Sequence, residues 1–178
     1  MPLTKAQRVK QRRARRRCNR SKVKNGHRAG SRKQGCKAVA VGNAAAKLKQ
    51  GSQSVALGAG SGAVNQGNNA VAVGYRSGFI DQGTKSIAIG SNSGVLKQGV
   101  GSVTIGHESG QDVGIDSIAI GQYAANTGGG PLFVPNNSIT LNASGIPQGT
   151  GSNCIHLNAS NQIPLPFYES DGGLFVNP

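Results

Sequence analysis

Three-residue apolar runs recur along most of this chain at a spacing of 16 residues. They occur at 39–41, 55–57, 71–73, 87–89, 103–105 and 118–120, and only the last step is shorter, by one residue. β-Branched residues dominate the runs, as they do in strands. A glycine such as Gly42 or Gly58 ends each run, where a tight corner needs a positive φ. A period of 16 is too short for a helical hairpin or a propeller blade. The pattern therefore predicts an all-β fold, a parallel solenoid in which each repeat forms one narrow coil.

A weaker apolar position lies on the other side of each repeat. Leu48, Val64 and Leu96 are among its members, and each is followed two residues later by glutamine and then by glycine. This spacing predicts a second short strand in each coil. The glutamines are expected to stack in register, each side-chain amide bonding to the next at about 4.8 Å. They are Gln34, Gln50, Gln66, Gln82 and Gln98.

Strand alternation divides each apolar run into two faces. The flanking Val, Ile or Leu pair is expected to fill the solenoid interior, which leaves the small central residue on the outside. A strand that is apolar on both faces is normally covered on both, and so thin a solenoid buries little surface alone. We therefore expect copies of the chain to pack in parallel with cyclic symmetry. The predicted interface comprises Ala40, Ala56, Ala72, Ala88, Thr104 and Ala119.

The repeats resemble a known family of head domains. "SVALGAGSG" at 54–62, "AVAVGYRSG" at 70–78 and "SIAIGSNSG" at 86–94 are similar to repeats of trimeric autotransporter adhesins. The interposed "QG", with "NSITLNASG" at 137–145 and "FVNP" at 175–178, more closely resembles repeats in virion proteins of large DNA viruses. The resemblance covers about residues 26–178. It implies a left-handed parallel β-roll, a homotrimer and a structural role in a virion.

Two departures from these families qualify what the resemblance implies. Bacterial adhesins carry a signal peptide, a coiled-coil stalk and a membrane anchor, and this sequence has none, which counts against surface display by that route. The viral relatives often continue beyond "FVNP" into a self-cleaving chaperone domain, whereas this chain stops at Pro178. We therefore expect a short family member or a matured product.

Positive charge is concentrated near the N-terminus. Residues 1–49 hold 17 Lys or Arg and no Asp or Glu, whereas residues 50–178 hold 3 Lys or Arg and 6 Asp or Glu. This asymmetry favours a polyanionic partner. No aromatic residue is interleaved with the first cations, so electrostatic binding of nucleic acid without base readout is expected. Docking on other capsid proteins is the alternative. The predicted contacts are Lys5, Arg8, Lys10, Arg12, Arg13, Arg15, Arg16, Arg17, Arg20, Lys22 and Lys24.

Composition divides the chain into three segments. Residues 1–25 form a basic arm, either disordered until it meets a polyanion or helical from a cap at Thr4 through Arg17. Residues 26–126 form the solenoid. The sequence "TGGGPLFVPNN" then interrupts the period, so residues 127–178 are expected to form a small β-rich cap with strands in "SITLN" and "CIHLN".

The histidines and acids do not form a plausible reactive centre. His27 and His107 fall five repeats apart, about 24 Å, and His156 alternates with apolar neighbours. Asp112 and Asp116 flank the shortened repeat, where together they could bind a cation. We expect them instead to be ordinary surface acids. Hexapeptide-repeat acyltransferases are another left-handed β-helix class, but the period of 16 argues against them. We predict no enzyme activity, no cofactor and no small-molecule substrate.

Cysteine and hydropathy patterns bear on the compartment. Cys18, Cys36 and Cys154 are odd in number and widely spaced, which predicts free thiols in a reducing compartment. Neither a signal peptide nor a run of about 20 apolar residues is present, so no membrane span is expected.

Taken together, these patterns predict a minor capsid-type virion protein that assembles in the host cytoplasm, a trimeric solenoid whose basic arm contacts the genome or the inner capsid. The alternatives are an adhesin-type head or fibre protein that binds a host surface and a cellular protein that compacts nucleic acid.

Overall fold

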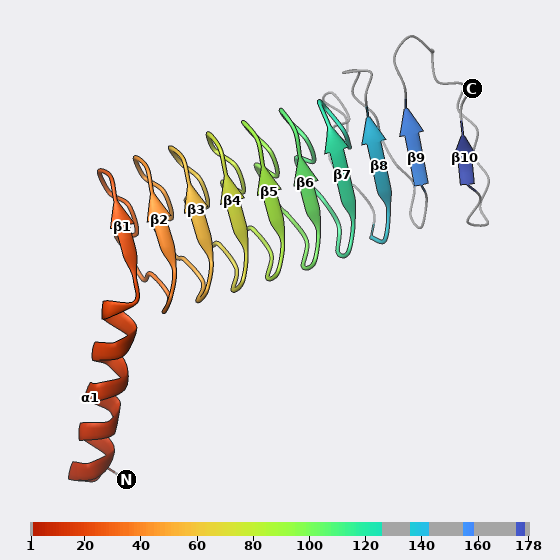
Figure 1. Cartoon of the computed structure of the whole chain (residues 1–178). Coiled ribbons are helices and arrows are strands. Elements are labelled where there is room, and N and C mark those ends of the chain that lie inside the picture. Colours follow the sequence, from red (N-terminus) through yellow and green to blue (C-terminus); the bar gives the residue numbers. More distant parts are fainter. Residues whose placement is uncertain (1, 126–135, 143–154, 159–173, 177–178) are drawn as a thin grey trace.

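The computed structural model is a β-solenoid preceded by one helix (Figure 1). It describes residues 2–125 and 136–142, together with strands at 155–158 and 174–176. Ten short strands form one sheet in sequence order, and every neighbouring pair is parallel. The elements are α1 (Lys5–Arg20), β1 (Val23–Asn25), β2 (Val39–Val41), β3 (Val55–Leu57), β4 (Val71–Val73), β5 (Ile87–Ile89), β6 (Val103–Ile105), β7 (Ile118–Gly121), β8 (Ile139–Asn142), β9 (Ile155–Asn158) and β10 (Leu174–Val176).

The strands that the 16-residue period predicts are confirmed from β2 to β7, and the sheet extends beyond them at both ends. At the start, β1 pairs with β2, so residues 23–25 belong to the sheet although we had assigned them to the arm. At the other end, "SITLN" and "CIHLN" do form strands, β8 and β9. These strands continue the same parallel sheet from β7, where a separate cap was expected. β10 extends the sheet by one more parallel strand, and the rest of the expected cap lies outside the described residues.

Each strand with the loop that follows it makes one coil, and the coils are numbered by their strands. Coil 1 runs from 23 to 38, coil 2 from 39 to 54, and coil 5 from 87 to 102. The outward side of the strands is called the strand face. The outward side of the opposite stretch, which comprises 31–33 in coil 1 and 47–49 in coil 2, is called the back face. Bonds such as Arg32 N–H to the Lys47 carbonyl, at 3.0 Å, hold successive coils together there.

The direction of the strand side chains is opposite to our expectation. Ala40, Ala56, Ala72, Ala88, Thr104 and Ala119 all have 0% of their surface exposed within the single chain, so they line its interior. The flanking residues project outwards instead: Ile89 is 37% exposed and Ile120 is 38% exposed. The prediction that the alanines form the trimer interface is therefore wrong in this fold. The physical reason is width: a glutamine from the opposite wall spans the coil, which leaves room only for a small residue at the centre of the strand.

The rest of the interior is also small and polar. A serine two residues before the central strand residue is fully buried ahead of β3, β5, β6 and β7: Ser54, Ser86, Ser102 and Ser117. The glutamines stack as predicted, as the bridges between Gln34 and Gln50 and between Gln50 and Gln66 show. The second strand is reduced to such isolated bridges.

The bonds of the glutamine amides differ from the expected ladder. Each Nε2 crosses the interior and donates to the first carbonyl of the strand in its own coil, as Gln66 Nε2 does to Val55 O at 2.7 Å. The same bond recurs from Gln34, Gln50, Gln82 and Gln98. Because this carbonyl lies directly across the narrow coil, it accepts the hydrogen bond that we had expected the side-chain oxygen of the next glutamine to accept. The glutamines thereby fasten the back face to the sheet within each coil.

The glycine after each strand is fixed by both conformation and space. Gly74 has φ +125°, and a Cβ built on it would lie 2.5 Å from the Gly90 carbonyl oxygen of the next coil. Real Cβ atoms do not approach that closely, so a side chain there would push the coils apart. The positive-φ corner predicted from the sequence is confirmed.

Candidate functional site: a basic helix and an aliphatic sheet face

Helix α1 presents the predicted cations to solvent. Thr4 caps it, with the Gln7 backbone N–H donating to Thr4 Oγ1 at 3.3 Å and the Thr4 N–H donating to Gln7 Oε1 at 2.8 Å. The predicted cap is confirmed, and the helix extends three residues beyond the expected Arg17. Eight of the predicted contact residues lie exposed on it: Lys5, Arg8, Lys10, Arg12, Arg13, Arg15, Arg16 and Arg17. Arg20 ends the helix, and its side chain lies outside the described residues.

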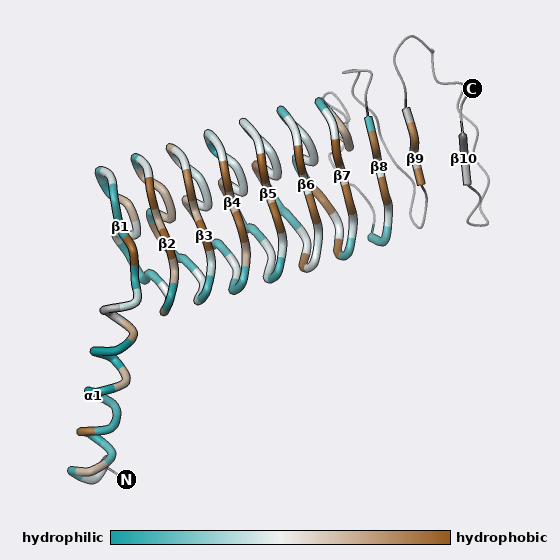
Figure 2. Tube along the Cα trace, viewed as in Figure 1, coloured by the Kyte–Doolittle hydropathy of each residue, from teal (hydrophilic) through white to brown (hydrophobic). Residues whose placement is uncertain are grey.

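The helix makes no conventional core-facing stripe. Its small apolar residues are few, and Val9 is 44% exposed. Figure 2 shows α1 as largely hydrophilic, in contrast to the hydrophobic strands. Because no carboxylate occurs on α1, its cations are not neutralised within the helix. Their mutual repulsion is a cost that a bound polyanion would remove.

Lys24 has a different role from the other predicted contacts. It pairs in register with Ala40, so its side chain is on the inward side of the first coil, where it remains exposed at the end of the sheet. Its Nζ donates to the Gly30 carbonyl at 2.5 Å. A charge that points inwards at an edge strand discourages pairing with another sheet. Lys24 therefore closes the open end of the solenoid.

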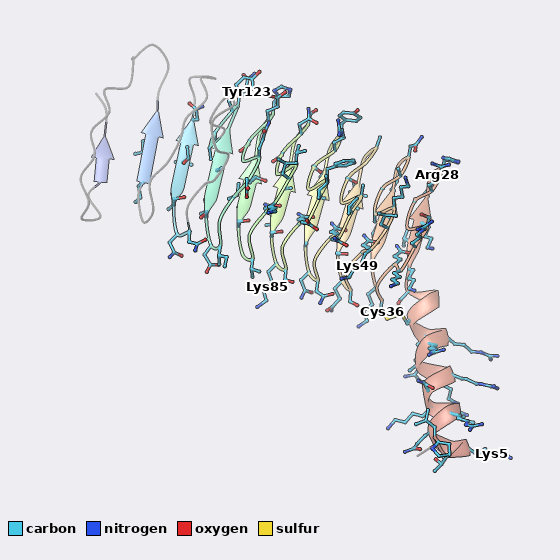
Figure 3. All side chains as sticks on the ribbon, turned by 180° about the vertical axis from the view of Figure 1, so that it is seen from behind. Lys5, Arg28, Cys36, Lys49, Lys85 and Tyr123 are labelled. Atoms are coloured by element: carbon cyan, nitrogen blue, oxygen red, sulfur yellow. A yellow bond between two sulfur atoms is a disulfide. The ribbon has the colours of Figure 1, made fainter. Side chains whose placement is uncertain are left out.

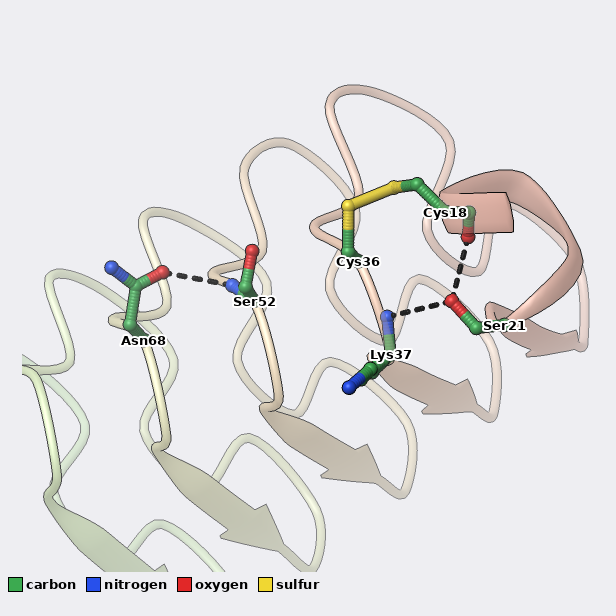
Figure 4. Close-up of a disulfide and its surroundings, with 6 residues drawn as sticks. All are labelled: Cys18, Ser21, Cys36, Lys37, Ser52 and Asn68. Carbon is green, nitrogen blue, oxygen red and sulfur yellow. Dashed lines mark hydrogen bonds between the residues drawn. A yellow bond between two sulfur atoms is a disulfide. The ribbon is translucent and has the colours of Figure 1, made fainter. Parts of the chain in front are cut away.

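A disulfide joins the helix to the solenoid, which corrects the prediction of free thiols. Cys18 in α1 bonds to Cys36 at the end of coil 1, with their Cα atoms 4.8 Å apart (Figure 4). The Ser21 hydroxyl reinforces the junction: it donates to Cys18 O at 2.8 Å and accepts from Lys37 N–H at 3.2 Å. Such crosslinks persist in oxidising surroundings and at virion or cell surfaces. Cys154 lies outside the described residues.

The Ser21 hydroxyl takes the place of the backbone carbonyl that a preceding coil would offer to the Lys37 N–H. In the next coil the equivalent bond runs from Gln53 N–H to Cys36 O, at 2.8 Å. The first coil has helix in place of a preceding coil, and the serine hydroxyl supplies the missing oxygen. The pairing of Cys18 with Cys36 carries no motif in the sequence. It becomes visible only when the helix end and the corner of coil 1 are placed together.

The strand face is a continuous aliphatic surface. Its outward positions from β2 to β9 are all Val, Ile or Leu, and Asn25 on β1 is the polar exception. Val23 is 49% exposed, Leu141 is 38% exposed, and most of the other members are half-buried. No charged residue lies on this face even where the surrounding sequence is most basic. Extended apolar surfaces of this kind are typical of interaction sites.

The residues considered for catalysis do not come together. His27 and His107 occupy equivalent corners of coils 1 and 6, each accepting a bond from the coil that follows. His107 lies 3.7 Å from Glu108 and stacks edge-on against Tyr123. Within the described part of the chain, no three His, Cys, Asp or Glu residues gather closely enough to hold a metal ion. None of the helices described there could cross a membrane.

Asp112 and Asp116, and Asp81 earlier in the solenoid, lie apart from one another. Asp81 accepts a hydrogen bond from Asn65 Nδ2 at 2.7 Å in the preceding coil. Burial raises the pKa of Asp112, and the nearby Lys97 partly offsets the effect. Asp116 is exposed at the corner that ends coil 6. Nothing in this arrangement pairs an acid with a base around a cavity.

Comparison with known proteins adds no family assignment, since no family model, no curated protein and no solved structure matches this chain.

Proposed function

We propose that this chain is a structural protein of a virion, a self-assembling solenoid whose basic end binds the phosphate backbone of nucleic acid. The observation that carries the proposal is the separation of two surfaces on one rigid scaffold. Cations occupy α1 and the start of the solenoid, while the strand face carries none. One surface suits a polyanion, and the other suits a copy of the chain.

Self-assembly proceeds through the strand face. The aliphatic columns there run the length of the sheet, and the strands of each copy are parallel, so equivalent coils of neighbouring copies can meet in register. Cyclic symmetry closes such an arrangement without leaving an apolar surface exposed. The number three comes from the resemblance to trimeric head repeats. This proposal keeps the expected homotrimer but exchanges its interface, from the buried alanines to the outward Val, Ile and Leu residues.

Nucleic acid is the partner proposed for the basic end. Arginine predominates on α1, and its guanidinium fork binds phosphate oxygens in pairs. No aromatic residue lies on the helix to stack on bases, so binding is electrostatic and indifferent to sequence. In a trimer, three such helices would project from one end of the assembly. A capsid-associated position facing the genome follows, with assembly in the host cytoplasm.

Fluorescence anisotropy with a short labelled duplex tests the nucleic-acid proposal. If about eight phosphates are neutralised per chain, the logarithm of affinity should fall with the logarithm of salt at a slope near −7. The matched variant replaces the eight exposed cations of α1 by glutamine, which keeps the helix propensity, the Thr4 cap and the disulfide. Loss of most of the slope in this variant supports the proposal. A full-length protein whose binding is independent of salt would reject it in favour of docking on capsid protein.

The virion location has its own test. Mass spectrometry of purified particles, combined with stepwise disruption, should find the chain in the internal fraction. Release by protease from intact particles would instead favour the adhesin-type alternative.

A further inference from the structure

We infer that the nucleic-acid footprint does not end with α1 but continues onto the back face of coils 1 and 2, where Arg32, Lys33, Lys47 and Lys49 form its second half. This inference rests on the proposed function and extends it to a second set of residues. The two halves are held in a fixed relation by the Cys18–Cys36 disulfide.

The four side chains are brought together by the stacking of the two coils. Arg32 N–H donates to Lys47 O at 3.0 Å, and Gln50 N–H donates to Lys33 O at 3.2 Å. The bridge between Gln34 and Gln50 places the backbone of Lys33 beside the backbone of Lys49 in the next coil, at the usual strand spacing of about 4.8 Å. Arg32, Lys33 and Lys49 are exposed, and Lys47 is half-buried.

The stack of Lys33 on Lys49 is electrostatically unfavourable by itself. Like charges directly opposite each other on neighbouring strands destabilise a sheet. Coils 1 to 3 contain no carboxylate that could relieve this repulsion, because the first acidic residue in the sequence is Asp81. The ion pair between His107 and Glu108, at 3.7 Å, lies far along the solenoid from these two lysines.

The same column is neutralised in later coils, which provides an internal comparison. Positions 33, 49, 65, 81 and 97 are equivalent. Asn65 donates to Asp81 at 2.7 Å, which shows that adjacent side chains of this column reach each other. Lys97 in turn acts on Asp112 of the following coil. Among the described coils, this column holds two successive cations only in coils 1 and 2, and it carries no acid there.

The backbone also bears a cost at the first of these positions. Lys33 has φ +48°, a left-handed conformation that favours glycine, asparagine or aspartate. The equivalent positions 65 and 81, which share this conformation, do hold asparagine and aspartate. Left-handed lysines also occur at Lys37 and Lys85, so the cost that is particular to Lys33 is its position next to Lys49. A ligand that binds both ammonium groups supplies the compensation that the chain lacks.

The helix lies at the corner where this back face ends. Lys33 is three residues before Cys36, and the disulfide fixes α1 at that corner. A shallow hollow of about 400 Å³ lies between the helix and the corner, lined by Ala14, Arg15, Cys18, Lys22 and Cys36. In Figure 3, Cys36 lies between Lys49 on the solenoid and Lys5 at the far end of the helix. One phosphate backbone can therefore pass from the helix across the corner to the back face.

The test compares two double variants with the same change of charge. Lys33→Gln/Lys49→Gln removes the uncompensated pair, and Lys85→Gln/Lys97→Gln removes two exposed lysines from coils 4 and 5. Each is measured in the full-length oxidised protein by anisotropy with a duplex over a range of salt concentrations. The first variant should flatten the log–log slope by about 2 and weaken binding at 0.1 M salt by at least tenfold and up to about 60-fold. The second should leave slope and affinity within about twofold of the unchanged protein.

The outcomes separate this inference from the proposed function. If both variants bind as the unchanged protein does, the footprint ends at α1 and the inference fails while the function stands. If the unchanged protein shows no salt-dependent binding, the proposed function itself fails. Thermal melting guards against a trivial loss, because removing the Lys33–Lys49 repulsion should leave the melting temperature equal or higher.

Discussion

The assignment of the two strand faces can be tested at adjacent residues that should behave in opposite ways. Ala88 is 0% exposed and stacks in register between Ala72 and Thr104, each about 4.8 Å away. Ala88→Lys must place four methylenes and an ammonium in that closed space. Overpacking costs about 1–3 kcal/mol, and an unpaired buried charge adds several kcal/mol more. Because each coil contacts only its neighbours, the damage should spread along the solenoid.

Ile89→Lys should leave the single chain folded. The Ile89 side chain is 37% exposed, and the stem of a lysine can cover the same surface while its ammonium stays in water. The expected cost within one chain is about 1 kcal/mol or less. In the proposed trimer, however, three ammonium groups would meet at the shared interface. This variant should therefore lose assembly and keep its strands.

Circular dichroism and light scattering measure the two effects separately. Ala88→Lys should lower the melting temperature by more than about 10 °C, and Ile89→Lys should keep a β-type spectrum but give the mass of a single chain. Gln53→Lys is the control, because the equivalent corners already hold Lys37 and Lys85. A folded, monomeric Ala88→Lys together with an unfolded Ile89→Lys would show that the alanines face outwards after all.

Four further outcomes follow from particular contacts. Ser77 Oγ is buried without a partner, whereas the equivalent Ser93 donates to Thr104 Oγ1 at 2.9 Å. Because Ala88 is the equivalent of Thr104 in the preceding coil, Ala88→Thr should give Ser77 a partner and be more stable than the isosteric Ala88→Val, by about 1 kcal/mol in urea titration. Equal stability of the two variants would contradict this pairing. Lys24→Ala should promote end-to-end association, seen as a concentration-dependent rise in sedimentation coefficient, because it removes the inward charge from β1; an unchanged coefficient would count against the capping role. Cys36→Ser removes the disulfide that fixes the helix, so trypsin should cleave the segment between α1 and β1 under conditions where the unchanged protein resists. Equal resistance would show that the Ser21 contacts alone hold the helix to the solenoid. Burial raises the pKa of Asp112, so the folded state binds its proton more tightly than the unfolded state, and the ionised carboxylate lowers the stability of the fold above that pKa. Asp112→Asn should therefore raise the melting temperature at neutral pH and lose that advantage as the pH falls below the ordinary aspartate range. An equal melting temperature at both pH values would refute the burial of this carboxylate.

The sequence was sufficient to locate the strands because glycine and β-branched residues mark each coil at a constant spacing. It did not by itself decide which face is inside. Alternation places Ala56 opposite Val55 and Leu57, but both orientations satisfy that rule. A signal was present in the residue two positions before the alanine. Ser54 shares its face, and a column of serine and alanine suits the interior of a narrow coil better than its surface.

Other features depend on distances that no local pattern encodes. The disulfide requires the end of α1 to meet the corner of coil 1, and 18 residues separate the two cysteines. The glutamine bonds depend on the width of the coil, which brings the strand carbonyl within 2.7 Å of Gln66 Nε2. The cap of the basic helix, by contrast, is a local signal: Thr4 was expected to cap a helix as one of two alternatives for the arm, and in the structure Gln7 completes the capping box. Local chemistry was thus readable from the sequence, and contacts across the coil were not.

Native mass spectrometry of the full-length protein, alone and mixed with a short duplex at low salt, tests the central claim in one measurement. We expect a species with three times the chain mass of 18.1 kDa, and a second species heavier by one duplex. The duplex adduct should disappear as salt is raised while the trimer persists, since the two surfaces are separate. A single-chain mass at micromolar concentration, or a trimer that takes up no duplex, would overturn the proposed function.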